Sequence, residues 1–348
     1  MEHLAQQAVE WMKRCGVAYG DVRFVAEREQ DIAVSNGTVQ TLTDERSCGF
    51  GVRVLVNGAW GFHSSCEVAE AEIERVVRQA CAIAAASALT ASEPVRLAEV
   101  EPCRGQYTTP YEKDPFEVPL ATKLETLIAA SRAMMGEPVV LAQSFFKACE
   151  TVKTFASTDG ALVRQRIVET GGGIAATSVR DGQMQVRSYP NSFRGNFATA
   201  GYEYFEQMAV LSQAERVRRE SVALLSAPQC PSGRRTVILE GGQLALQVHE
   251  SIGHPIELDR VLGMESAYAG DSFLTLDKLD RLQYGSPLVN VVADATVPGG
   301  LGTFGYDDEG VPAQRTPIIA EGRFVGYMSS RETAPLIGRT SSGTMRAS

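Results

Sequence analysis

The apolar positions of the first part of the chain repeat with two different periods, which predicts helices packed on β-hairpins. Residues 1–15 and the alanine-rich segment 67–87 carry apolar side chains at helical spacing. Between them, alternating runs predict strands at 21–28, 31–35, 39–42, 51–56 and 60–62. Asn36-Gly37 and Asn57-Gly58 predict tight hairpins, because type I′ turns need positive φ at both central residues.

After residue 117 the pattern again predicts a helix, a series of strands and a second helix. A polar stretch with four prolines, 93–117, predicts an extended linker. Helical spacing then predicts helices at 120–135 and 202–225, and alternating runs predict strands at 139–149, 152–157, 162–169, 173–178 and 184–188. The three glycines 171–173 predict a bulge or a strand corner.

The last part of the chain predicts a third, β-rich unit. An apolar run at 236–239 predicts a buried strand that leads into a helix at 241–252. Further strands are predicted near 288–293, 316–320 and 323–329. We therefore predict an α+β fold of hairpin-rich antiparallel or mixed sheets with packed helices. The predicted units are an N-terminal α+β unit at 1–92, a linker at 93–117, a central α+β unit at 118–228 and a C-terminal unit at 229–348.

Composition narrows the classes of function. The formal net charge of −9 argues against a nucleic-acid groove built on bulk charge. No apolar run is long enough to span a bilayer, and the N-terminus lacks the basic and apolar regions of a secretory signal. The seven cysteines are scattered and predict free thiols. We expect a cytoplasmic protein with no direct nucleic-acid or membrane partner.

One short segment carries most of the candidate chemistry. His249, Glu250 and His254 lie within six residues, and they include two of the four histidines of the chain. Neutral imidazole is a common zinc ligand, and a neighbouring glutamate can accept a proton from water. The spacing is His-Glu-x-x-x-His, one residue longer than the zincin motif. We predict His249 and His254 as metal ligands and Glu250 as the catalytic base.

The extra residue requires a distorted helix. Side chains at i and i+5 lie about 140° apart on a regular α-helix, against about 40° for i and i+4. The helix can widen in a π turn, or it can end or kink at Gly253, and Pro255 stops a regular helix shortly afterwards. Either distortion would bring the two imidazoles to one point, and the residues alone leave both open.

The motif and four later segments resemble the TldD/PmbA family of zinc-dependent peptidases, on the TldD side, because PmbA-type paralogues lack the histidine pair. The resemblance is dense from about residue 235 onward and looser before it. The segments that carry it are 249–257, 294–300, 302–312, 327–334 and 342–347.

The resemblance implies a zinc peptidase that hydrolyses unfolded or unstructured peptides as a dimer, with itself or with a PmbA/TldE-type paralogue. It also implies a third zinc ligand, a cysteine, in a family segment that would follow Ser348. No Cys or His follows His254, and Glu257, Glu265 or Asp271 could substitute only in principle. The alternative is a catalytically silent binding or assembly subunit.

A glycine-rich segment near residue 300 allows a second interpretation. Residues 300–305 fit G-x-G-x-x-G, but a loop with three acids follows, whereas a dinucleotide site needs a helix there. We instead expect an extended ligand to contact this region, with Gly302, Tyr306, Asp308 and Glu309 as candidate substrate-binding residues.

Overall fold

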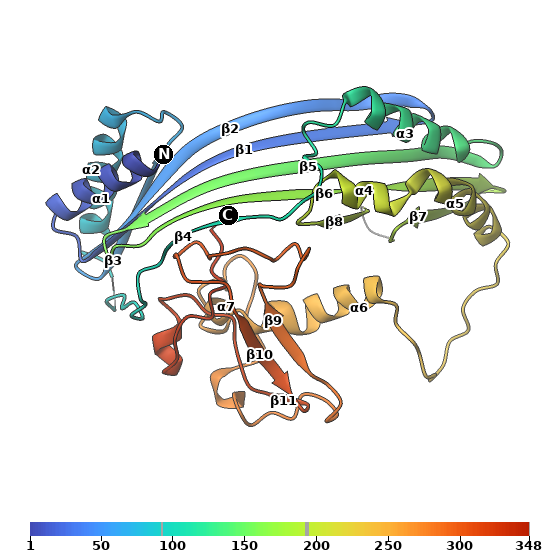
Figure 1. Ribbon diagram of the computed structural model, residues 1–348. Coiled ribbons are helices and arrows are strands. Elements are labelled where there is room, and N and C mark those ends of the chain that lie inside the picture. The colour runs from blue at the N-terminus through green and yellow to red at the C-terminus, as the bar shows by residue number, and fades with distance from the viewer. Residues whose placement is uncertain (92, 192–194, 348) are drawn as a thin grey trace.

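A long, curved β-sheet arches over the C-terminal third of the chain (Figure 1). The computed structural model describes residues 1–91, 93–191 and 195–347. In these residues eight strands form the sheet, in the order β3-β2-β1-β5-β6-β4, with β7 and β8 also paired to β6. Their bounds are β1 Tyr19–Ser35, β2 Thr38–Val56, β3 Ala59–Ser65, β4 Arg104–Thr108, β5 Val139–Ser157, β6 Leu162–Arg180, β7 Gln183–Tyr189 and β8 Asn196–Ala198.

Four of these strands are longer than the sequence pattern indicates. β1, β2, β5 and β6 each join two predicted strands, because the polar residues between the apolar runs keep the alternation. Along β1, for example, Gln30 is buried between exposed or half-buried acids. β1 pairs with β5 over its length from Asp21 to Ser35, so strands from the predicted N-terminal and central units form one sheet. The predicted unit boundaries stay a prediction.

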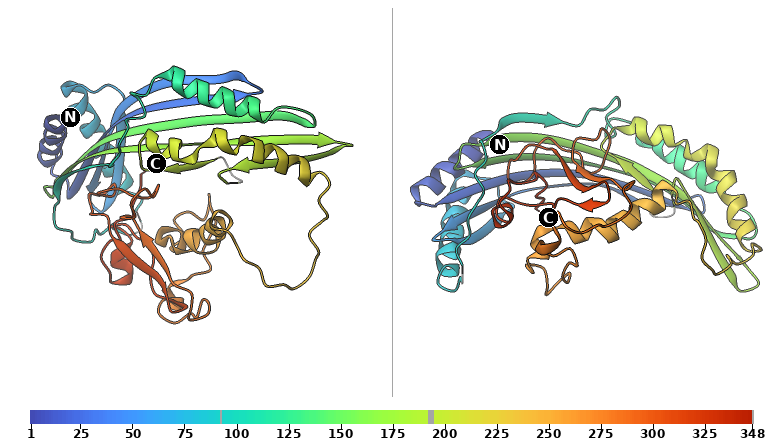
Figure 2. Two further views of the ribbon diagram at one scale, coloured as in Figure 1. Left: turned by 45° about the vertical axis from the view of Figure 1, so that its right-hand side comes forward. Right: turned by 90° about the horizontal axis from the view of Figure 1, so that it is seen from below.

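Helices cover the two ends of the arch (Figure 2). At one end, α1 Glu2–Arg14 and α2 Glu70–Ser87 bury Val22 and Phe24 of β1. At the other, α3 Leu120–Ala133, α4 Tyr202–Met208 and α5 Val210–Leu224 bury Ile32 and Val34 of the same strand. These four apolar residues of β1 are all at even positions, so one face of the strand supports both helical layers. The α+β class is as predicted.

Two local expectations are wrong, and the predicted linker contains one strand, β4, which pairs with β6 in parallel. The predicted helix 202–225 is two helices, because Ala209 has a left-handed conformation with φ 48°. Glycines 171–173 lie in β6 without a register shift. Neighbouring atoms pack so closely against the strand here that a larger side chain would not fit. A Cβ at Gly171, for example, would lie 2.2 Å from the carbonyl oxygen of Asn196.

The C-terminal third forms a smaller unit below the arch (Figure 1). Its three-stranded sheet has the order β11-β10-β9, and its core includes Ile252, Ile318 and Phe324. The bounds are α6 Gly241–Val248, α7 Leu258–Val261, β9 Val291–Asp294, β10 Arg315–Ala320 and β11 Arg323–Phe324. No helix in the described part of the chain is long and apolar enough to cross a membrane.

The predicted buried strand at 236–239 is not present. Residues 226–240 form a connector between α5 and α6 that has no helix or strand and is exposed throughout. Ile238 is 99% exposed, and Leu246 of α6 is 55% exposed. The apolar pattern of this region therefore has no surface to pack on in the part of the chain that the structure describes.

Buried ion pairs attach the C-terminal unit to the large sheet. The carboxylate of Glu309 accepts a hydrogen bond from Arg53 of β2 at 3.2 Å, and Asp308 pairs with Lys153 of β5. Asp307 is 1% exposed and accepts hydrogen bonds from the backbone N–H groups of Glu309 and Val311. Burial raises the pKa of Asp307 to about 7, although these hydrogen bonds oppose the shift.

Candidate metal centre

The motif lies where the α-helix changes to a wider turn. α6 ends at Val248, and His249–Gly253 form a π-helical turn. The N–H of His254 donates a hydrogen bond to the carbonyl oxygen of His249, which is the i to i+5 bond of a π-helix. The two imidazole rings consequently lie on the same side, with centroids 4.3 Å apart. The predicted distortion is confirmed, and it takes the form of a π turn.

Three side chains of the motif can approach one ion. His249, Glu250 and His254 each offer a ligand atom, and these atoms lie within 4.8 Å of one another. Zinc–nitrogen distances of about 2.0–2.1 Å would bring tetrahedral ligand atoms to roughly 3.4 Å. Small side-chain rotations would close that difference, because the side chains of His249 and Glu250 are 58% and 63% exposed. The donor set therefore fits a zinc ion.

The orientation of His254 is fixed by a residue that the sequence argument did not assign to this role. Its Nδ1 lies 3.2 Å from a carboxylate oxygen of Glu257, which leaves Nε2 available as a ligand. Arg260 holds the other carboxylate oxygen of Glu257 at 3.0 Å and also pairs with Glu265. The i to i+3 spacing from His254 to Glu257 was the available signal, because such residues are neighbours on a helical turn.

None of the three acids named as substitute ligands joins the cluster. Glu257 is engaged by His254 and Arg260, Glu265 pairs with Arg260, and Asp271 accepts a hydrogen bond from Ser266. Among the described residues, the one group of His, Cys, Asp and Glu side chains that could hold a metal is His249, Glu250 and His254. The cysteine ligand implied by the family resemblance stays a prediction.

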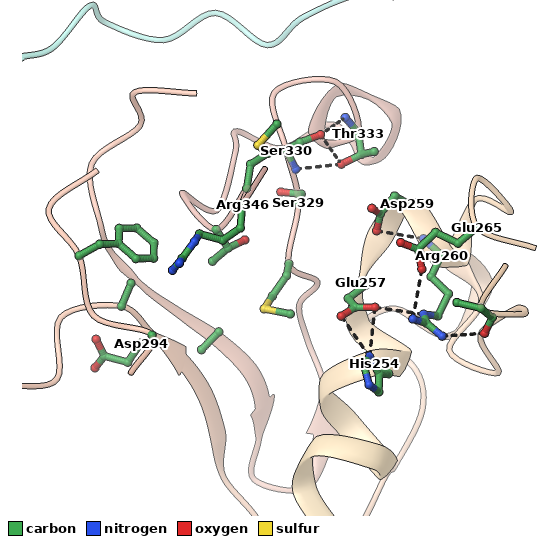
Figure 3. Close-up of a pocket in the computed structure, with 18 of the residues that line it drawn as sticks. His254, Glu257, Asp259, Arg260, Glu265, Asp294, Ser329, Ser330, Thr333 and Arg346 are labelled. Carbon is green, nitrogen blue, oxygen red and sulfur yellow. Dashed lines mark hydrogen bonds and ion pairs between the residues drawn. The ribbon is translucent and has the colours of Figure 1, made fainter. Parts of the chain in front are cut away.

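A cavity of about 660 Å³ opens beside the motif. Figure 3 shows His254, Glu257 and Arg260 on one side of it and Arg346 on the other. Asp294 of β9 lies at its wall, and Thr296 lowers the pKa of this carboxyl through hydrogen bonds to its oxygen. The cavity therefore joins the candidate metal centre to one edge of the three-stranded sheet.

The predicted substrate-binding residues are separated in the structure. Gly302 lines the cavity. The ring of Tyr306 packs against Gly105, and its carbonyl oxygen accepts a hydrogen bond from Gln165. Asp308 and Glu309 are each 2% exposed and form the ion pairs to the large sheet. A role of these four residues in substrate binding stays a prediction, and the burial of the two acids favours a role in docking.

Comparison with known proteins identifies the class. Residues 232–348 match the family model described as the PmbA/TldA metallopeptidase C-terminal domain, and residues 20–84 match the model of PmbA/TldA metallopeptidase domain 1. A metalloprotease of Methanocaldococcus jannaschii is 28% identical over 94% of this chain and 70% of its own length. A metalloprotease TldD homolog of Haemophilus influenzae is 26% identical over 96% and 68%.

The fold is also found in solved structures. A putative modulator of DNA gyrase from Thermotoga maritima has a TM-score of 0.78 at 20% identity. The match covers 99% of this chain and 74% of the Thermotoga chain. TldE from Thermococcus kodakarensis has a TM-score of 0.68 at 12% identity, with coverage of 99% and 74%. This chain belongs to the TldD/PmbA family of metallopeptidases.

Proposed function

We propose that this chain is a zinc-dependent peptidase subunit that hydrolyses unfolded or unstructured peptides. The observation that carries the proposal is the convergence of His249 and His254 beside Glu250 in the π turn. The two imidazoles would hold the ion, and by family resemblance a cysteine would be the third ligand. Zinc in such a site supplies Lewis-acid chemistry, polarising the scissile carbonyl and lowering the pKa of water toward neutrality.

In this proposal Glu250 is the general base. It follows His249 directly, and its carboxylate lies 3.9 Å from the His249 Nε2 atom. Its side chain is exposed, so water and a peptide can both reach it. In the proposed reaction a carboxylate oxygen of Glu250 accepts a proton from the attacking water and passes it to the leaving amine. Glu257 keeps His254 oriented throughout.

The edge of the small sheet offers a place for the peptide backbone. β9 pairs with β10 on one side, and Ala293 and Asp294 of β9 line the cavity. An extended peptide added along this edge would gain main-chain hydrogen bonds with little dependence on its sequence. That mode of binding suits unstructured substrates, because an unstructured segment can extend along the edge without first unfolding.

We propose a dimer, with a PmbA/TldE-type paralogue or with a second copy, in which the motif faces an inner chamber. The likeness to TldE supports the paralogue, and the exposed apolar residues of the connector and α6 support burial of that region on assembly. Free thiols at all seven cysteines fit a cytoplasmic location.

The alternative of a catalytically silent subunit is favoured by one observation: two imidazoles and one glutamate fall short of three ligands plus a base.

Zinc analysis combined with a hydrolysis assay tests the proposal. The chain, alone and together with a TldE-type partner, would be loaded with zinc and incubated with an unstructured peptide and with a folded protein. Near-stoichiometric zinc and cleavage of the peptide alone would support the peptidase. Zinc bound without cleavage in either form would favour the silent subunit. Failure of His249→Ala to reduce zinc binding would contradict the metal centre.

A further inference from the structure

The cavity beside the motif contains two guanidinium groups in different surroundings. Arg260 is fully engaged: it donates hydrogen bonds to Glu257 at 3.0 Å and to the carbonyl oxygen of Ala269 at 2.8 Å, and it pairs with Glu265 at 3.1 Å. Arg346 also lines the cavity. Within residues 1–91, 93–191 and 195–347, its guanidinium makes no hydrogen bond or ion pair. The cavity therefore has one cation available to a ligand among the residues described.

The surroundings of Arg346 hold it in place without using its donors. Its guanidinium carbon lies 5.4 Å from the centroid of the Phe304 ring. A cation–π contact of this kind positions a guanidinium without using its N–H donors. Figure 3 shows the side chain extending into the cavity from the C-terminal segment, with His254 on the opposite side. A ligand bound in this cavity could therefore contact both Arg346 and His254.

The large sheet supplies an acid near this arginine but no direct partner. Burial raises the pKa of Glu169 of β6, and the charge of Arg346 opposes that shift. Glu169 is therefore close enough to sense the charge, yet no hydrogen bond joins the two side chains.

We propose that Arg346 binds a carboxylate of the peptide substrate and sets a preference for acidic groups on one side of the scissile bond. This inference rests on the proposed function. A guanidinium presents a planar fork of donors that matches a carboxylate in a bidentate pair. The other acid-binding group in the cavity, Arg260, is already neutralised by Glu257 and Glu265. The carboxylate comes either from the C-terminus of a short peptide or from an Asp or Glu side chain.

Binding to the Glu250→Gln chain tests this without turnover. Three fluorescent probes share one unstructured ten-residue sequence: one has a free C-terminal carboxylate, one is the C-terminal amide, and one is the amide with a single internal Glu. We expect at least one carboxylate probe to bind about tenfold more tightly than the neutral amide, the factor for roughly 1.4 kcal/mol of a charge-assisted pair. Which carboxylate probe gains identifies the source.

Two variants in the same background complete the test. Arg346→Gln should abolish the difference between the carboxylate probes and the amide. Arg323→Gln is the matched control, because Arg323 is an exposed arginine on β11 that is not part of the cavity lining, and it should preserve the difference. Equal affinities for all three probes, or a preference that survives Arg346→Gln, would overturn the inference. A carboxylate preference that is lost in Arg346→Gln, without hydrolysis by the zinc-loaded chain, would contradict the proposed peptidase and still support carboxylate binding by Arg346.

Discussion

Nδ1 of His254 lies 3.2 Å from a carboxylate oxygen of Glu257, three residues further along the chain. Arg260 in turn holds the other oxygen of that carboxylate. The series of contacts from Arg260 to Glu257 to His254 orients the imidazole of His254 before any ion is bound. Such outer contacts fix the orientation of a metal-binding imidazole and raise its basicity, so their loss weakens metal binding.

Glu257→Gln should therefore weaken zinc binding about 10- to 100-fold while leaving the fold unchanged. The amide keeps the shape of the side chain but loses the charge that orients His254. Competition with a fluorescent zinc chelator would measure the loss. Asp259→Asn is a suitable control, because Asp259 lines the cavity but its carboxylate contacts the backbone N–H of Arg260. Equal affinities of the two variants would contradict the role of Glu257.

Glu250→Gln should keep zinc and lose peptide hydrolysis by a factor of about 10² to 10⁴, because the substitution removes the base and keeps its shape. His249→Ala should lose both. Zinc content and single-turnover cleavage, measured on the same preparation, separate the two effects. Unreduced turnover in Glu250→Gln would assign the base to another residue.

Gly253 is expected to tolerate alanine. Its φ of −52° is helical, and an added Cβ would make only an ordinary van der Waals contact with the carbonyl oxygen of Val248 at 3.8 Å. Gly253→Ala should change the free energy of unfolding by less than about 1 kcal/mol, in the stabilising direction, because alanine favours helix. Gly61→Ala is the contrast: its Cβ would lie 2.1 Å from the carbonyl oxygen of Ala80 and should cost about 1–3 kcal/mol. Chemical denaturation measures both.

The ion pair between Lys153 and Asp308 should be required for docking of the C-terminal unit. Lys153→Met leaves a carboxylate that is 2% exposed without its cation, which costs about 3–5 kcal/mol for a buried pair. Lys147→Met breaks an ion pair whose partners are 37% and 46% exposed, and it should cost less than about 1 kcal/mol. Hydrogen exchange at residues 306–312 would report the difference. Equal protection in both variants would show that the pair does not hold the unit.

Asp307 should make stability depend on pH. Its pKa is about 7 in the folded chain and near 3.8 when unfolded, so the folded state binds the proton more tightly. The stabilisation is complete below about pH 4 and is lost as the pH rises to 7, with a slope of up to about 1.4 kcal/mol per pH unit. Asp307→Asn should flatten the dependence of the unfolding free energy on pH over this range. The exposed Asp280→Asn variant should keep the slope of the wild type, and an unchanged slope in Asp307→Asn would refute the prediction.

The sequence predicts local structure well where one residue decides it. Asn36 and Asn57 adopt the positive φ values that the hairpin argument requires. The distorted helix at the motif also follows from the spacing of His249 and His254 alone, because a regular helix would separate them. The continuity of β1 was not predictable in this way, since it depends on 15 residue pairs with β5, which begins more than 100 residues later.

The contacts of charged side chains were the least predictable part. Asp308 and Glu309 lie in a glycine-rich loop, which suggests exposure and ligand binding. Their partners, Lys153 and Arg53, come from strands far away in the sequence, so only the fold shows that the acids are buried. Glu257 is different, because its partner His254 is one turn away. A search for a carboxylate that orients each candidate ligand would have found it.

The two units on either side of the exposed connector at residues 226–240 are held together by side-chain contacts as well as by the backbone. The ion pairs from Arg53 and Lys153 hold the C-terminal unit on the sheet from residues on either side of this segment. A cut within the connector would therefore leave one particle with both units in register. The two fragments, expressed as separate polypeptides, should complement each other, so that the candidate metal centre becomes a property of their association.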